Sequence, residues 1–122
     1  MHAKLMALVD ILLSAPDEIS LDEVCDDVKY DLGIADDREV KRLTLEAVRE
    51  MLRRGVLVDF DSDVPTKQCP PTTPDEVIAR IDHEWDALGE APTLPGEICV
   101  FAWTPAAMEA YARRQGLSGE RS

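Results

Sequence analysis

Aromatic side chains are scarce in this sequence: two Trp, two Tyr and two Phe residues make up 5% of 122 positions. The core is therefore expected to be aliphatic, with each aromatic ring filling a large share of it. Apolar residues at 45% and charged residues at 31% are typical of a globular domain. A chain of this length buries roughly two thirds of its unfolded surface without a metal or disulfide. We predict a single domain over residues 1–116 and a flexible tail over residues 117–122.

Cysteines are few, and long hydrophobic runs are missing. Cys25, Cys69 and Cys99 are odd in number and lie outside any CxxC or Cys/His ligand spacing, so they predict reduced thiols in a cytoplasmic protein and no metal site. Asp10 interrupts the apolar N-terminal run, which argues against a signal peptide. No stretch approaches the roughly 18 uncharged apolar residues of a membrane span, so no membrane association is expected.

Catalytic motifs are also missing, since the sequence contains no GxSxG, P-loop, HExxH or GxGxxG pattern. His83 is the only histidine beyond His2, and it lies between two carboxylates. The acidic stretch over residues 17–37 lacks the alternating ligands and central glycine of a calcium loop. These absences predict a non-enzymatic protein without a cofactor, a metal or a small-molecule substrate.

Basic residues are outnumbered, 13 against 25 acidic ones, which gives a formal charge of −12. The excess is concentrated in residues 10–37, where ten acidic residues accompany only Lys29, a local charge of 1 − 10 = −9. Such a charge disfavours phosphate backbones and anionic membranes and attracts a cationic protein. The predicted partner-binding residues are Asp22, Glu23, Asp26, Asp27, Asp36, Asp37 and Trp103. An acidic face that serves only solubility is the alternative.

Periodicity and helix-capping signals predict a helix-rich α+β domain. Ser20 with Glu23, Asp36 with Glu39, and Thr73 with Glu76 each have the sequence of a capping box at a helix start, and Pro74 takes the first position of its helix. The segment over residues 62–72 has three prolines and no periodicity, so it is expected to be a loop. The predicted elements are helices over 2–14, 20–33, 36–54, 73–88 and 104–115 and strands over 56–61 and 97–103.

The two tryptophans flank a turn rich in proline and glycine. Trp85 falls on one helix face with Ile78, Ile81 and Leu88, so we expect it to pack inside and to join its helix to the sheet. Trp103 ends the second strand and remains the candidate for an exposed contact residue.

The phrase MLRRGVLV, at the end of the third predicted helix, resembles the winged-helix group of helix-turn-helix domains. The resemblance covers residues 2–60, with residues 97–103 as the returning strand of the wing. It implies a winged-helix-like domain whose third helix reads DNA. This chain departs from the pattern, because residues 62–96 separate the two wing strands and contain a predicted helix. The second half also resembles small uncharacterised bacterial proteins, which implies no particular activity.

Two functions follow from these patterns. The first is an acidic cytoplasmic module that binds a basic protein, as an immunity or antitoxin-type inhibitor does. The alternative is a DNA-binding transcriptional regulator that acts as a homodimer. Its basic stripe consists of side chains within about 60° of one another on the third helix. These are Arg38, Arg42, Arg49 and Arg53. A solvated helix with pairs such as Glu46 with Arg49 and Glu50 with Arg54 also explains the stripe.

Overall fold

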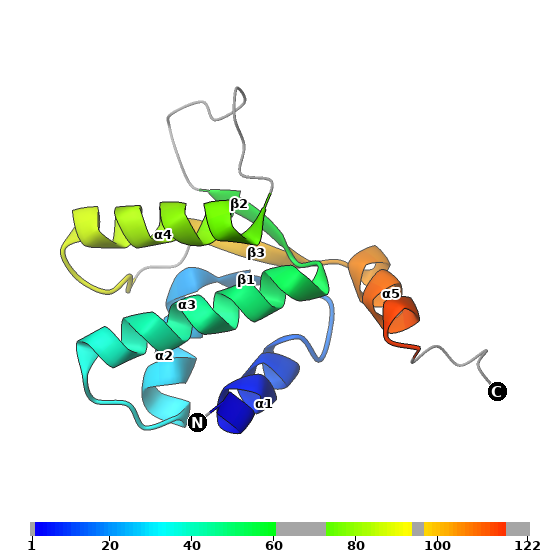
Figure 1. Cartoon of the computed structure of the whole chain (residues 1–122), viewed down its shortest axis with the longest axis horizontal. Helices are drawn as coiled ribbons and strands as arrows, with labels where there is room; N and C mark the ends of the chain where they lie inside the picture. Colours follow the sequence, from blue (N-terminus) through cyan, green and yellow to red (C-terminus); the bar gives the residue numbers. More distant parts are fainter. Residues whose placement is uncertain (1, 61–72, 94–96, 117–122) are drawn as a thin grey trace.

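The computed structural model describes residues 2–60, 73–93 and 97–116. The loop expected over 62–72 and the tail expected over 117–122 lie outside these ranges. The described residues form five helices and three strands (Figure 1). In chain order these are α1 His2–Leu12, β1 Asp17–Ser20, α2 Leu21–Asp31, α3 Asp37–Arg54, β2 Leu57–Phe60, α4 Pro74–Leu88, β3 Cys99–Trp103 and α5 Pro105–Arg114.

The three strands form one antiparallel sheet in the order β1-β3-β2. Phe101 in the central strand pairs with Ile19 on one side and Val58 on the other, so β3 holds both edge strands. The predicted α+β class is confirmed, including the helix α4 inserted in the chain between the antiparallel strands β2 and β3 and the C-terminal helix α5.

Strand β1 is the one element that we did not predict. Its sequence, DEIS, is half acidic and contains a single β-branched residue, so local propensity disfavours a strand. Pairing with β3 supplies the missing stability, because Ile19 enters the core opposite Phe101 and both side chains are nearly inaccessible to solvent. The acidic residues Asp17 and Glu18 point to solvent on this edge strand.

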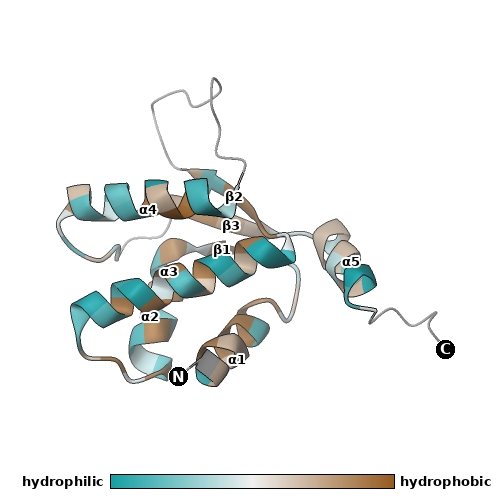
Figure 2. Cartoon of the chain, in the orientation of Figure 1, coloured by the Kyte–Doolittle hydropathy of each residue, from teal (hydrophilic) through white to brown (hydrophobic). Residues whose placement is uncertain are grey.

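Helix α3 is the centre of the helical part. It contacts α1, α2 and α4, and in Figure 1 it runs beside α4 with α1 and α2 on its other side. Its core-facing side is aliphatic, whereas polar colours dominate much of α3 and α4 in Figure 2. The side chains that α3 buries are Val40, Leu43, Thr44, Ala47, Val48, Met51 and Arg54. Helix α5 lies beyond the end of α3, to one side of the body (Figure 1).

The helix-start signals have mixed outcomes. Thr73 and Glu76 form the predicted capping box, whereas Ser20 and Asp36 occupy N-cap positions without a side-chain capping bond. The prediction of capping boxes at these two sites was therefore wrong. At the third helix the reason is visible, because the carboxylate of Glu39 accepts hydrogen bonds from Arg42 instead.

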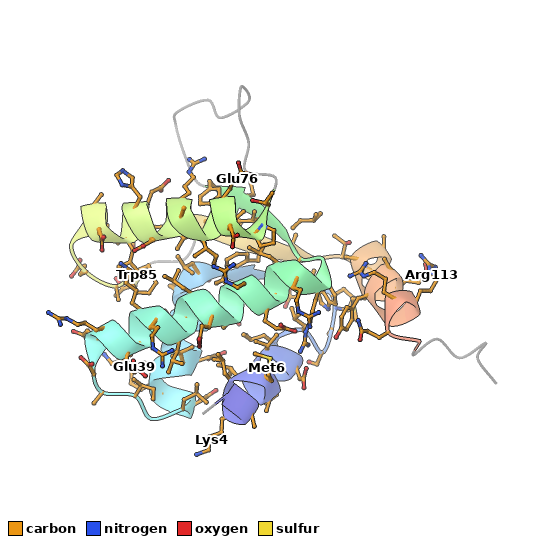
Figure 3. The ribbon with its side chains drawn as sticks, in the orientation of Figure 1. Lys4, Met6, Glu39, Glu76, Trp85 and Arg113 are labelled. Atoms are coloured by element: carbon orange, nitrogen blue, oxygen red, sulfur yellow. The ribbon has the colours of Figure 1, made fainter. Side chains whose placement is uncertain are left out.

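Trp85 packs inside as predicted, and 6% of its surface is exposed. Figure 3 shows the side chain pointing from α4 toward α3. The buried partners on α4 are Val77 and Ile81, while Ile78 is only partly buried. Leu88 was expected on this face but is 36% exposed, because it lies in the last turn of α4, immediately before the C-cap Gly89.

Candidate functional site

The outward side of α2 carries the largest part of the predicted acidic site. Leu21, Val24, Cys25 and Val28 point into the core, so helical spacing turns most of the residues between them, although not Asp22, toward solvent. We call this surface the α2 face, and it consists of Glu23, Asp26, Asp27 and Tyr30.

The carboxylates of the α2 face are not neutralised. Within the described part of the chain, none of its three acidic side chains forms an ion pair. Partial burial raises the pKa of Asp27 above its usual range. The same pKa is raised further by the charges of three other carboxylates on α2, those of Asp31, Glu23 and Asp26. The carboxylates of the face therefore repel one another, and a bound cation would reduce this repulsion.

Tyr30 is the residue of this face that the sequence analysis missed. Its side chain is 71% exposed, and the Nζ atom of Lys29 lies 5.5 Å from the ring centroid. The signal that reveals it is positional, because Tyr30 follows Asp26 and Asp27 by four and three residues and so shares their side of a helix. Tyr is enriched at protein interfaces, which makes its exposure among carboxylates informative.

Asp36 and Asp37 are exposed at the start of α3, as predicted. A groove of about 580 Å³ joins this point to the α2 face, since Asp26 and Tyr30 line one side of it and Asp37 lines another. The turn that follows α4 completes the groove with Glu90 and Pro92. The fold thus brings Asp26 of α2 and Asp37 of α3, both in the predicted site, to the same groove. The groove itself was not predicted.

Two residues of the predicted site are not on the surface. Asp22, in the first turn of α2, is only 9% exposed. Trp103, expected as an exposed contact, is 4% exposed. Its indole Nε1 donates a hydrogen bond to the carbonyl of Leu13 at 2.9 Å, and Tyr111 covers the ring edge-on at 6.3 Å between centroids. The expectation for Trp103 was wrong, because the indole connects Leu13, the residue after α1, and Tyr111 of α5 to the sheet.

The basic stripe of α3 is exposed, but most of its charge is compensated. Arg42 binds Glu39 at 2.6 Å and Glu46 at 3.3 Å, Arg53 binds Glu50, and Arg49 reaches Asp75 on α4. Within the stripe, Arg38 is the one residue that forms no ion pair with a described residue. The predicted pair of Glu50 with Arg54 is confirmed, whereas the predicted pair of Glu46 with Arg49 is wrong, since each has another partner.

Helix α4 brings further carboxylates to this surface. Lys41 of α3 lies between Asp82 at 2.5 Å and Asp86 at 2.7 Å, both on α4. Five cationic side chains therefore lie among six carboxylates. The cations are Arg38, Lys41, Arg42, Arg49 and Arg53, and the carboxylates are Glu39, Glu46, Glu50, Asp75, Asp82 and Asp86. The local charge is 5 − 6 = −1, so this surface offers phosphate little net attraction.

The two described thiols are not reactive groups. Cys25 and Cys99 are buried and unpaired with each other. Burial raises the pKa of both thiols, which keeps them protonated and weakly nucleophilic. The described ranges contain no group of three or more His, Cys, Asp or Glu side chains placed to hold a metal ion. None of their helices is long and apolar enough to cross a bilayer.

Comparisons with known proteins returned no matching family model, no matching curated protein and no matching solved structure.

Proposed function

We propose that this chain is a non-enzymatic module that recognises a protein partner with a basic surface, and that the α2 face is its contact. The observation that carries the proposal is a contrast between two helices. Within the described ranges, the carboxylates of the α2 face form no ion pair and crowd one another around an exposed tyrosine, whereas most cations of α3 are paired.

The physical advantage of such a face is twofold. An unneutralised negative patch on a molecule of charge −12 steers a cationic partner and raises the association rate. Tyr30 then supplies a rigid ring that loses little conformational entropy when it is buried. Inhibition of a basic enzyme or toxin in the cytoplasm, in the manner of immunity proteins and antitoxins, is the form of this function that we favour.

The test uses two variants of equal charge. In the face variant, Glu23→Gln, Asp26→Asn and Asp27→Asn remove three carboxylates from α2. In the matched control, Glu18→Gln, Asp59→Asn and Glu109→Gln remove three exposed carboxylates elsewhere. Wild type and both variants are immobilised, and quantitative mass spectrometry compares the proteins that each retains from host lysate. We expect a basic protein that wild type and control retain and the face variant loses; equal retention by all three would refute the proposal.

A DNA-binding regulator of the winged-helix kind is the second candidate. Three helices before the second strand, the strand order β1-β3-β2 and the outward basic stripe favour it. The acidic residues that flank the stripe weigh against it. A gel shift on the DNA upstream of its own gene tests it. A regulator requires a shift at low salt that Arg42→Ala with Arg49→Ala abolishes, and no shift by wild type would eliminate this candidate.

A further inference from the structure

The groove beside the α2 face has an apolar floor. Four of its lining residues are buried side chains, namely Val40, Cys25, Trp85 and Pro92. Trp85 is the largest of them, and it enters from α4 (Figure 3). At about 580 Å³ the groove has the size of pockets that enclose small ligands, and it suits one or two side chains of a partner better than a whole element.

The rim of the groove is charged, and its side chains without an ion-pair partner carry a net negative charge. Lys41 is a rim cation that Asp82 and Asp86 already neutralise. Three rim carboxylates have no ion-pair partner in the described ranges, those of Asp26, Asp37 and Glu90. Lys29 and Arg38 are the rim cations that form no ion pair with a described residue. Counting these five side chains gives 2 − 3 = −1, and the remaining carboxylates of the α2 face, Glu23 and Asp27, make the surroundings more negative.

We propose that the groove binds a long basic side chain, Arg or Lys, of the partner segment that docks on the α2 face; this inference rests on the proposed function. Such a side chain has an apolar stem that covers an apolar floor and a cationic head that remains with carboxylates at the rim. The ring of Tyr30 lines the groove and is 71% exposed, and the face of an aromatic ring attracts a cation. A neutral apolar side chain would cover the floor but would leave the rim carboxylates without a cation. An acidic side chain would be repelled by those carboxylates.

The proposal predicts opposite effects from two neighbours at the start of α3. Asp37→Asn removes an attractive charge and is expected to weaken binding about two- to fivefold, the effect of one exposed charge pair. Arg38→Gln removes a repulsive charge and is expected to strengthen binding by about the same factor. A groove that binds anions reverses both signs.

The experiment is an NMR titration of the isotope-labelled chain with a capped peptide that contains two arginines, at low ionic strength. The matched control peptide replaces each arginine by citrulline, which keeps the shape and removes the charge. We expect chemical-shift changes at Asp26, Tyr30 and the indole of Trp85 with the arginine peptide only. Glu109→Gln, on the remote helix α5, is the protein control and leaves the affinity unchanged.

Three results would overturn the inference: equal binding of the two peptides, shift changes confined to residues outside the groove, or an affinity unaffected by Asp37→Asn and Arg38→Gln. Because the titration requires no natural partner, it separates the two proposals. If the arginine peptide does not bind, but the face variant fails to retain a partner that wild type retains, the groove proposal is refuted and the proposed function stands. If the arginine peptide binds in the groove, but wild type and both variants retain the same proteins, the groove proposal stands and the proposed function is refuted.

Discussion

Tyr30 and Trp103 show how position decides the role of a residue. Tyr30 is on the outer side of α2, where 71% of its surface meets solvent and the Nζ atom of Lys29 lies 5.5 Å from the ring centroid. Trp103 is on the inward side of β3, where its indole N–H finds the carbonyl of Leu13. The first side chain is therefore available to a partner, and the second stabilises the fold.

Replacement of the exposed ring separates binding from stability. We expect Tyr30→Ala to change the free energy of unfolding by less than about 0.5 kcal/mol, because the ring is mostly exposed. Partner affinity should fall about 30-fold, the effect of losing a 2 kcal/mol interface residue. Urea unfolding and calorimetric titration measure the two quantities. A large loss of stability with unchanged affinity would assign Tyr30 to the fold.

Trp103→Phe tests the structural role of the buried indole. The change leaves the Leu13 carbonyl without its donor and should lower the free energy of unfolding by about 1–3 kcal/mol. Trp85→Phe is the control, because Trp85 is similarly buried but its indole N–H bonds to no described residue. Equal losses in the two variants would show that ring volume, rather than the hydrogen bond, accounts for the effect.

Crowding on α2 predicts a residue whose removal stabilises the protein. The pKa of Asp27 is raised in the folded state, so the folded protein binds this proton more tightly than the unfolded chain does. The free energy of unfolding therefore falls as the pH rises through the shifted pKa. Asp27→Asn should therefore raise the melting temperature at pH 7 and have little effect at pH 3. Solvent screens the site, so the gain remains below about 1 kcal/mol. A variant that melts lower at pH 7 would contradict the crowding.

At the scale of elements, one ionic cluster connects three helices. Arg54 of α3 is 9% exposed, and its guanidinium binds Glu50 at 2.9 Å and Asp10 of α1 at 2.7 Å. The guanidinium also lies 5.5 Å from the centroid of the Tyr111 ring, while Arg114 of α5 donates to the Arg54 carbonyl at 3.0 Å. Since α5 buries no residue completely, these contacts help to fix its position.

Glu50→Gln should loosen this cluster in a pH-dependent way. Hydrogen bonds from Arg53 first and Arg54 next lower the pKa of Glu50, although partial burial opposes them. The stabilisation is therefore present above the ordinary glutamate pKa of about 4.3 and is lost as the pH falls through the lowered folded value. We expect a loss of about 2 kcal/mol at pH 7 that shrinks below pH 4.

The control for this prediction is Glu46→Gln on the same helix. Glu46 pairs with Arg42 in a solvent-exposed position, so its removal should cost less than about 0.5 kcal/mol. Chemical denaturation of both variants across this pH range measures the difference. A deficit of Glu50→Gln that is constant with pH would attribute it to packing.

Periodicity predicted the elements better than the contacts between them. The stretch over residues 37–54 has strong amphipathic spacing and a glycine after it, and Gly55 adopts the left-handed conformation that ends α3. Strand β1 was missed because its stability comes from β3, far along the chain. Helical spacing accounts for the exposure of Glu23 and Asp26 on α2, whereas the burial of Asp22 was not predicted. The burial of Trp103 and the pairing of Arg49 with Asp75 depend on tertiary contacts that no local pattern contains.

At the scale of the whole molecule, paired charges and unpaired carboxylates lie on different surfaces. Helices α3 and α4 compensate each other through pairs such as Lys41 with Asp82, whereas no described cation forms an ion pair with the α2 face. A negative molecule of this kind accepts a cationic partner most favourably where its own cations are fewest. The groove at the start of α3 joins the two surfaces, so single substitutions there report on the sign of the ligand's charge.

The most direct test of the proposed recognition of a basic protein is the dissociation constant of the captured partner for Asp26→Asn and for Arg38→Ala, each measured against wild type at low salt. We predict that Asp26→Asn weakens binding and Arg38→Ala strengthens it, each about two- to fivefold, with both effects reduced at high salt. The opposite pattern, in which loss of Arg38 weakens binding and loss of Asp26 strengthens it, would contradict recognition of a basic partner.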